Sequence, residues 1–475
     1  MADLGIATSR KQKVFAVKET TQGELKFPSA SDFIMPAGPA TIKQTPAFKN
    51  SDEIKNSLDV VDQFQNALPP GDWTCDMYLR VPDLYSEDIQ GDIFFESLQG
   101  SKKTTGTVSA DLQTTIDNVA TSIILDLSSI AGDTRFPETG VVTMDSEKIY
   151  YRGTTTATST ITLNNCIRAW DGSTAASHIA PATCTLTSPW FRQKVGGDSF
   201  SLWVQTDHFT QALSGCTVSS GTLGLNNEGA VTWKMSGQGM AMYWAGSDDV
   251  KTNSASGQKD IAATDSNKFS VGAYIKVVHA DGTEDTNAGA GYVISAITTA
   301  SNTLTVSSSL VDTWAAGDEI QGFLPTGAEV PNAIESRYTY IWVDDTQGKF
   351  QSSDLTFNTP KNYIIDEIGT THPDGFVEDV RNITSNMNVY FRKDDAKYFE
   401  LGSLGNTFKL HFLFGNMGAN VDGANHDTER KLAISLPKTR SDTPTISISG
   451  ATVSLSMPTS CLGTEGEDSC DIVMI

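Results

Sequence analysis

The stretch ALPPGDWTCDMYLRVPD, from Ala67 to Asp83, decides the fold class. Two prolines and a glycine predict a turn, and an alternating run follows it. One side of that run favours a core: Trp73, Cys75, Met77 and Leu79. The other side is polar, charged or aromatic: Thr74, Asp76, Tyr78 and Arg80. Because successive side chains of a strand point to opposite faces, the pattern predicts a half-buried β-strand.

The rest of the composition extends this prediction to the whole chain. The protein has 475 residues, of which 39% are hydrophobic, so it can bury sizeable cores. Gly, Ser and Thr are abundant and long apolar helical runs are scarce, which favours β structure. The predicted fold class is mainly β: a β-sandwich or barrel parent domain with a short helix, and two inserted small β modules. The run DDAKYFELG, residues 394–402, is the predicted short helix.

The two inserts are recognised by a change in composition. Residues 104–189 and 251–330 are rich in Thr, Ser and Ala, and each contains short strand-like runs. The parent domain is then made of three segments: 1–103, 190–250 and 331–475. The runs TSTITLNNC and SNTLTVSSS occupy similar places in the two inserts, which suggests a duplicated module.

Charge and hydropathy exclude several functions. The formal net charge is −23, which argues against binding nucleic acid through its phosphates. The N-terminal run MADLGIATSRKQKVFAVK lacks the apolar region of a signal peptide, and no apolar run is long enough for a membrane span. We therefore expect no membrane insertion.

The cysteines predict no structural framework. The six are scattered without zinc spacing, which is typical of free thiols in a reducing cytoplasm. Bridges between Cys166 and Cys184, or between Cys461 and Cys470, are the alternative.

No motif predicts catalysis. P-loop, GxSxG, HExxH and useful GxGxxG patterns are missing from the sequence, and the six histidines are far apart along it. The loops ADGTEDTNAG (280–289) and NVDGANHD (420–427) carry oxygen ligands suited to calcium but lack the EF-hand pattern. We interpret them as solvated turns. The sequence therefore predicts no enzyme activity, no metal and no cofactor.

Residues 51–68 allow two interpretations. In the run SDEIKNSLDVVDQFQNAL the apolar residues fall at helical spacing, so periodicity alone predicts a helix. Five prolines flank the segment, at positions 36, 39, 46, 69 and 70, and they suit an extended hairpin arm better.

The order of these segments resembles that of the major tail tube proteins of long-tailed bacteriophages. The resemblance is carried by five stretches: FAVKETTQGEL, FKNSDEIKNSLDVVDQFQNALPPGDWTCDMYLRVP, SGCTVSSGTLGLNNEGAVTWKMSGQG, VRNITSNMNVYFRKDDAKYFELGS and RKLAISLPK. It covers most of the parent domain. The first insert resembles a β module that recurs in phage structural proteins.

The resemblance implies a structural role in the virion tail, with assembly in the host cytoplasm. Family members form rings of six tail tube domains, and the rings stack into a tube. The implied partners are further copies of the chain, other tail proteins at the tube ends, and the tape-measure protein and DNA in the lumen. Two inserts leave little room for a contractile sheath, so a non-contractile tail is expected. The alternative is a β-rich phage or cell-surface adhesin that binds carbohydrate or a receptor through its inserts.

The resemblance also implies which surfaces touch. An N-terminal arm (1–30) and a hairpin (31–70) would bridge subunits and rings. The candidate inter-ring contacts are Phe33, Ile42, Phe48, Ile54, Leu58, Val61 and Phe64. The polar side of the main sheet would face the lumen, where carboxylates repel the DNA backbone. The candidate lumen residues are Asp76, Asp344, Asp345, Asp394 and Asp395.

Overall fold

A computed structural model gives the structure of the chain. It describes residues 11–51, 62–82, 89–106, 108–132, 135–226, 228–392, 397–415, 431–449, 452–463 and 466–475. The protein is mainly β, with 52% strand and 6% helix, which confirms the predicted fold class. The α-helices within the described ranges are α1 (Asp92–Gln99) and α2 (Lys397–Ser403). The second lies where a short helix was predicted. None of the described helices has the length and apolar character needed to cross a bilayer.

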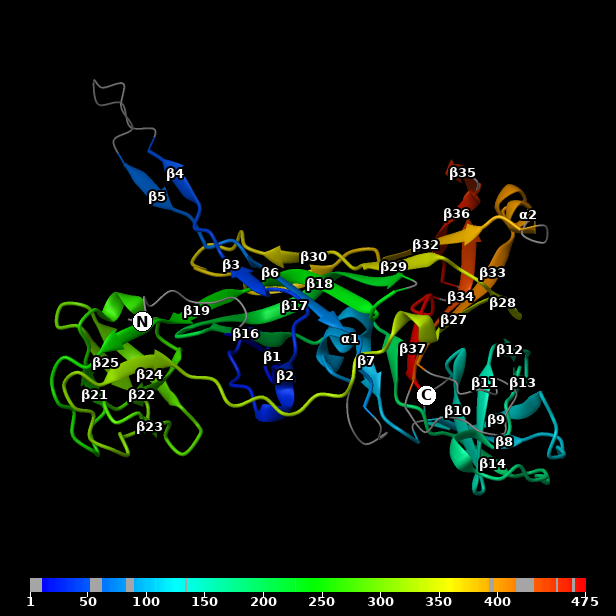
Figure 1. Ribbon diagram of the computed structural model, residues 1–475, viewed down its shortest axis with the longest axis horizontal. Helices are drawn as coiled ribbons and strands as arrows, with labels where there is room; N and C mark the ends of the chain where they lie inside the picture. The colour runs from blue at the N-terminus through cyan, green and yellow to red at the C-terminus, as the bar shows by residue number, and fades with distance from the viewer. Residues whose placement is uncertain are drawn as a thin grey trace.

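The parent domain contains the same antiparallel arrangement twice (Figure 1). We call the first copy repeat 1. Its strands are β1 (Gln12–Lys18), β2 (Phe33–Ile34), β3 (Thr41–Lys43), β6 (Gly71–Tyr78), β16 (Phe200–Thr206), β17 (Phe209–Asn226) and β18 (Thr232–Gly239). They pair in the order β2-β1-β16-β17-β18-β6-β3, and α1 follows β6 in the chain.

Repeat 2 follows the second insert. Its strands are β27 (Thr339–Val343), β28 (Thr346–Gly348), β29 (Ser352–Asn358), β32 (Asn382–Tyr390), β33 (Thr407–Phe414), β34 (Leu432–Ser441), β35 (Thr445–Ser449) and β36 (Thr452–Cys461). They pair in the order β28-β27-β33-β34-β36-β32-β29, with β35 continuing β34 beside β36. Helix α2 follows β32 as α1 follows β6.

The two repeats share even their irregularities. In repeat 1 the register shifts between the pair Phe200–Cys216 and the pair Leu202–Leu213. In repeat 2 it shifts in the same way between Phe408–Thr439 and Leu410–Leu436. A bulge that recurs at the same place, after a phenylalanine and before paired leucines, identifies the repeats as two copies of one structural unit.

A single sheet runs through both repeats. Strand β17 pairs with β29 over Ser220–Asn226 and Ser352–Asn358, which joins the repeats edge to edge. The resulting eight-stranded sheet has the order β3-β6-β18-β17-β29-β32-β36-β35, and every pairing is antiparallel.

One face of this sheet covers the main core. The alternation expected on β6 is confirmed, because Trp73, Cys75, Met77 and the following Leu79 are all buried. The Trp73 ring stacks on Phe94 of α1, with ring centroids 5.5 Å apart.

Each repeat carries a two-stranded arm just before the strand that precedes its helix, which is β6 in repeat 1 and β32 in repeat 2. The arm of repeat 1 is β4 (Phe48–Asn50) paired with β5 (Gln63–Gln65), and the arm of repeat 2 is β30 (Lys361–Ile364) paired with β31 (Gly375–Glu378). Periodicity alone predicts a helix over residues 51–68. That prediction is wrong for the described part of the segment, where Gln63–Gln65 form a strand. Flanking prolines and strand pairing outweigh the apolar spacing there. Ile54, Leu58 and Val61 lie outside the described residues.

Four further strands of the parent domain lie outside the eight-stranded sheet. Strands β7 (Gly100–Lys103), β15 (Trp190–Gln193) and β37 (Asp471–Met474) pair in series and join β34. Strand β19 (Ala241–Ala245) pairs with β17 before the chain enters the second insert.

The inserts form separate small sheets at the two ends of the molecule (Figure 1). Module 1 contains β8 (Val108–Leu112), β9 (Ile123–Gly132), β10 (Thr139–Met144), β11 (Glu147–Arg152), β12 (Thr154–Thr156), β13 (Thr160–Leu163) and β14 (Thr183–Leu186). Module 2 contains β20 (Ser247–Asp249), β21 (Asp260–Ala262), β22 (Tyr274–Val278), β23 (Glu284–Asp285), β24 (Tyr292–Thr298), β25 (Thr303–Val306) and β26 (Glu319–Gly322). The first strand of module 2 thus precedes residue 251.

The modules share a topology. Strands β8 and β10 flank β14 in module 1 as β20 and β22 flank β26 in module 2. Likewise β9 and β12 flank β13 as β21 and β24 flank β25. This agreement supports the duplication suggested by the sequence. All six cysteines are free thiols, so neither of the alternative bridges forms.

Candidate assembly and lumen surface

The face of the eight-stranded sheet opposite the core is polar from one end to the other. Residues that lie directly opposite each other on paired strands share a face, so the registers define its rows. One row is Asp76, Lys234, Thr222, Thr356, Thr384 and Ser460, and it continues to Arg440 near the end of β34. A second row is Asn226, Ser352, Asn388, Ser456 and Thr445. We call this surface the polar face.

The polar face is mostly uncharged. Hydroxyl and amide side chains dominate it. Two pairs of opposite charge face each other across strands, whereas the exposed Arg440 lies opposite Ser460. Lys43 lies opposite Asp72, and Lys234 lies opposite Asp76. Asp354 is a further carboxylate, and its Oδ1 accepts a hydrogen bond from the Asn386 backbone N–H at 2.9 Å. The arrangement is a hydrated neutral wall with small local dipoles.

The structure places the predicted lumen carboxylates differently from one another. Asp76 lies on the polar face. Asp344 and Asp345 form the turn between β27 and β28, outside the eight-stranded sheet. Asp344 accepts a hydrogen bond from the Lys409 N–H at 2.8 Å, and Asp345 accepts one from Asn165 of module 1 at 2.7 Å. Asp394 and Asp395 lie outside the described residues. A pair of aspartates after a strand therefore marks a turn here.

Both ends of the eight-stranded sheet are edges. Among the described residues β3 pairs with β6 alone, and β35 pairs with β36 alone. Strand β35 has the sequence TISIS, and its isoleucines point away from the polar face. Ile446 is 52% exposed and Ile448 is 75% exposed. Such an apolar strand edge is a surface that readily pairs with another strand.

The arm of repeat 2 docks within the chain. The Tyr363 hydroxyl donates to the carbonyl oxygens of Gly215 at 2.7 Å and Gln238 at 2.8 Å. The Lys361 ammonium lies 3.1 Å from Glu378 and donates to the Ser97 carbonyl at 3.0 Å. Through these contacts the arm formed by β30 and β31 packs against repeat 1, the neighbouring structural unit.

The arm of repeat 1 projects from the body instead (Figure 1). All six residues of β4 and β5 are exposed, including the aromatic side chains of Phe48 and Phe64. Of the other predicted contacts, Ile42 is buried and Phe33 is half-buried, with its ring 5.4 Å from that of Phe15. The inter-ring candidates that lie within the described residues therefore divide into exposed arm residues and residues already packed in repeat 1.

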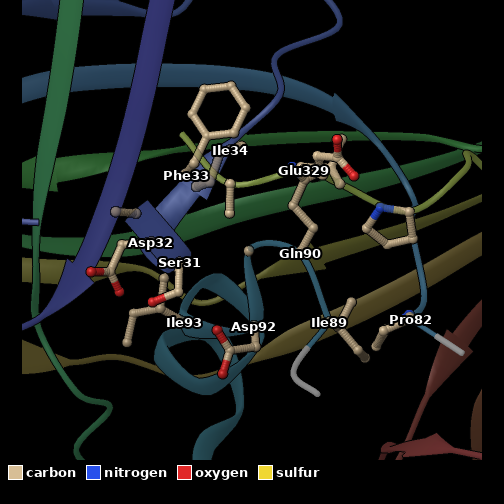
Figure 2. Close-up of a pocket in the computed structure, with 15 residues that line it drawn as sticks. Ser31, Asp32, Phe33, Ile34, Pro82, Ile89, Gln90, Asp92, Ile93 and Glu329 are labelled. Carbon is tan, nitrogen blue, oxygen red and sulfur yellow. The ribbon is translucent and has the colours of Figure 1, made fainter. Parts of the chain in front are cut away.

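A cavity of about 460 Å³ lies between the start of α1, β2 and the linker 328–331. Figure 2 shows carboxylates from three separate segments at its rim, those of Asp32, Asp92 and Glu329. Asp32 accepts hydrogen bonds from Ser29, and Asp92 pairs with Lys102 at 2.9 Å. These contacts serve local structure, and the described residues of the cavity lining include no histidine, cysteine or lysine.

Module 1 contains a buried polar cluster around Glu147. Its carboxylate accepts hydrogen bonds from Arg168 at 2.8 and 2.7 Å and from the N–H groups of Ala169 and Ala176. His178 Nε2 lies 2.8 Å from the same carboxylate, and His178 Nδ1 lies 2.8 Å from Asp145. These internal donors surround both Glu147 oxygens. The cluster therefore ties the loops of module 1 together, and the carboxylate has no lone pair left over for an external ligand.

Module 2 has a comparable centre at Asp285. This buried carboxylate accepts hydrogen bonds from the Tyr292 hydroxyl and from Trp314 Nε1 at 2.9 Å. Asp285 belongs to the loop considered for calcium, so that loop uses its best ligand internally. No group of three metal-suitable side chains occurs among the described residues. The loop 420–427 lies outside them.

The Glu147 cluster predicts acid sensitivity. Burial opposes ionisation, but the hydrogen bonds from Arg168 and His178 outweigh it and lower the pKa of Glu147. Its stabilising contribution is therefore complete above the unfolded pKa of about 4.3 and is lost as the pH falls through the lower folded value. Glu147→Gln should cost about 1.5–3 kcal/mol of unfolding free energy at pH 7, since a charged acceptor is lost.

This prediction is checked by thermal unfolding between pH 7 and pH 3. The variant should also lose part of the wild-type decline below about pH 4.3. Glu24→Gln is the control, because Glu24 is exposed and its removal should change stability by less than about 0.5 kcal/mol. Equal effects of the two substitutions would contradict the assigned role of Glu147.

Comparisons with known proteins add no identification. No family model matches the chain, and no curated protein matches it. Sequence reasoning missed the features that distinguish this surface, namely the internal repeat, the β35 edge and the docked arm. The alternating run TISIS was the available signal for the edge.

Proposed function

We propose that the protein is the structural subunit of a bacteriophage tail tube, and that it has no enzymatic role. In this proposal the eight-stranded sheet forms part of a cylindrical wall around an aqueous lumen that conducts DNA. One observation carries the proposal: a repeated sheet has one continuous polar face and, within the described residues, an unpaired strand edge at each end. Edge pairing between copies would close such sheets into a ring and satisfy those edges.

The chemistry of the polar face supports passage of DNA. A wall rich in Lys and Arg would release counterions from DNA and hold it in a salt-dependent manner. The polar face instead carries mostly hydroxyl and amide groups. Two of the three cations that its described residues supply, Lys43 and Lys234, lie opposite aspartates, so it offers little such hold. The net charge of −23 adds long-range repulsion, which acts over about 8 Å at physiological salt. The wall we propose is therefore neutral where it meets DNA and not lined by acidic rings.

The internal repeat changes the expected number of chains. Each chain supplies two copies of the structural unit, so a ring of six units contains three chains. In Figure 1 both modules lie on the α1 side of the sheet, away from the polar face. In a tube they would decorate the outer surface, which fits a non-contractile tail without a close sheath.

The tube itself is tested by electron microscopy of the purified protein. We expect stacked rings with a central channel, whose wall carries the polar face on the inside. A protein that stays monomeric under assembly conditions and binds glycans would contradict the proposal and favour the adhesin alternative.

The neutral wall gives a second test. The triple variant Thr222→Lys, Thr356→Lys and Thr384→Lys places three cations in one row of the polar face. Assembled variant tubes should retain a fluorescent DNA duplex at low salt and release it as salt rises, with the affinity falling steeply in log salt. Wild-type tubes and the matched Thr→Gln triple variant should retain none. Duplex binding that is the same for all three tubes would contradict a lumen-facing polar face.

A further inference from the structure

The junction at which the two repeats pair within the chain shows how the edges of two such units can fit together. In it β17 pairs with β29, and Leu223 lies opposite Leu355. Both leucines are fully buried, and Leu225 nearby is 5% exposed. The junction therefore hides the apolar side chains of two strand edges while its other side continues the polar face.

The free edge of β35 matches the β17 side of this junction. Leu223 follows Leu213, the paired leucine that borders the bulge of repeat 1, by as many positions as Ile446 follows Leu436, its counterpart in repeat 2. Each also has an apolar partner on the next strand, Trp233 for Leu223 and Leu455 for Ile446. Ile446 and Ile448 thus hold the positions of Leu223 and Leu225, but they are exposed where the leucines are buried.

The free edge of β3 matches the β29 side. Leu355 lies opposite Ser385 on β32, and Ser385 lies opposite Thr459 on β36. Ile42 lies opposite Trp73 on β6, and Trp73 lies opposite Gly237 on β18. The shared registers of the repeats place Ile42 at the position of Leu355.

We propose that β35 of one copy of the chain pairs with β3 of the next copy in the register of the β17–β29 junction. Ile446 then lies opposite Ile42, Ser447 opposite Thr41, and Thr445 opposite Lys43. The contact is head to tail, so successive copies continue one sheet and its polar face until the ring closes. This inference goes beyond the proposed function, because it rests on strand registers and does not depend on what passes through the ring.

The arms support the same contact. The docked arm continues from β29 and binds repeat 1, which lies across the junction from it. The projecting arm continues from β3 in the same way. Across the proposed contact it would meet repeat 2 of the neighbouring copy, where Phe48 and Phe64 can be covered.

Disulfide cross-linking tests the register. The double variant Thr41→Cys and Ser447→Cys places one thiol on each edge, on the polar face. Directly opposite residues have Cβ atoms about 4.5–5.5 Å apart, close enough for a bridge after small adjustment. Mild oxidation of the assembled protein should give a non-reducing gel ladder in steps of 51.0 kDa. In a ring of six units the ladder should end at three chains.

Two controls define the result. The pair Thr41→Cys and Thr445→Cys is shifted by two residues, which separates the thiols by about 7–8 Å and should prevent the bridge. Ser447→Cys alone should give no dimer, since a dimer would mean that β35 pairs with itself. Equal cross-linking of both double variants, cross-linking of neither, or a Ser447→Cys dimer would overturn the proposal.

A separate variant tests the edge without added thiols. Ile446→Lys puts a charge on an exposed side chain, so folding should be unchanged while edge pairing is blocked. We expect particles of 51.0 kDa by mass photometry, whereas Ile179→Lys, at an exposed isoleucine of module 1, should assemble normally. Normal assembly of Ile446→Lys would count against the inference. If tubes form but the cross-link does not, the proposed function stands and the β35–β3 contact is wrong. If cross-linked rings form but never stack into an open tube, the contact stands and the proposed function is wrong.

Discussion

Replacing Trp233 with alanine should lower the free energy of unfolding of the parent domain by about 3–5 kcal/mol. Trp233 on β18 is fully buried and lies between elements of both repeats. Its ring centroid is 4.9 Å from that of Phe95 on α1 and 5.6 Å from that of Phe357 on β29. Truncation would leave a cavity where the two repeats share one core, so both should lose stability together.

Urea unfolding followed by circular dichroism measures this effect. Trp233→Phe is the matched variant, because it retains an aromatic ring and removes an indole N–H that has no hydrogen-bond partner. It should cost less than about 1.5 kcal/mol. Trp244→Ala, at an exposed tryptophan on β19, controls for the loss of an indole at the surface. A Trp233→Ala variant no less stable than Trp244→Ala would contradict a shared core.

The sequence predicted local structure better than the arrangement of strands. The alternation around Trp73 and the short helix near Tyr398 were recognisable because each depends on neighbours along the chain. The internal repeat was not recognised, since a buried strand position accepts many apolar residues. Trp233 and Leu455 hold the same place, as do Leu223 and Ile446. Module 1 also interrupts repeat 1 between β7 and β15, which hides the common order of elements.

The candidate surface shows the same limit. Thr74 and Asp76 could be assigned to the polar side of their strand by alternation alone. The rest of that face includes residues of β29 and β32, and no local pattern in the sequence shows which strands pair across such a sequence distance. Asp344 and Asp345 attracted attention through charge, but charge does not specify a face, and a turn explains them.

The second large effect concerns the docked arm of repeat 2. Glu378→Ala should lower the free energy that holds this arm on repeat 1 by about 3 kcal/mol, the cost of breaking a buried ion pair. The side chains of Lys361 and Glu378 are both buried, and the carboxylate also accepts hydrogen bonds from the N–H groups of Gly196 and Gly197. Burial already lowers the pKa of Lys361, and Glu378 opposes that shift. Without Glu378 the ammonium loses its closest compensating charge.

The loss should appear as local opening and not as global unfolding, because the arm is a separate two-stranded sheet. Amide hydrogen exchange over 361–364 and 375–378 should become about a hundredfold faster, whereas exchange in β17 should stay unchanged. Glu367→Ala removes the same charge from an exposed position between the two strands of the arm and should leave exchange unaltered. The pair Lys361→Met with Glu378→Leu should restore part of the protection, since apolar replacements of a buried pair cost little, while Arg381 still loses its contact with Glu378.

This result also bears on assembly, because the docked arm is the internal counterpart of the projecting one. If docking in the chain depends on a few buried polar contacts, the arm formed by β4 and β5 requires a comparable surface on another copy. The Glu378→Ala variant should then still form rings through β35 and β3, but with the second arm of each chain opening more often. Unchanged exchange at 361–364 would instead show that the Tyr363 hydrogen bonds hold the arm by themselves, and Tyr363→Phe would become the decisive substitution.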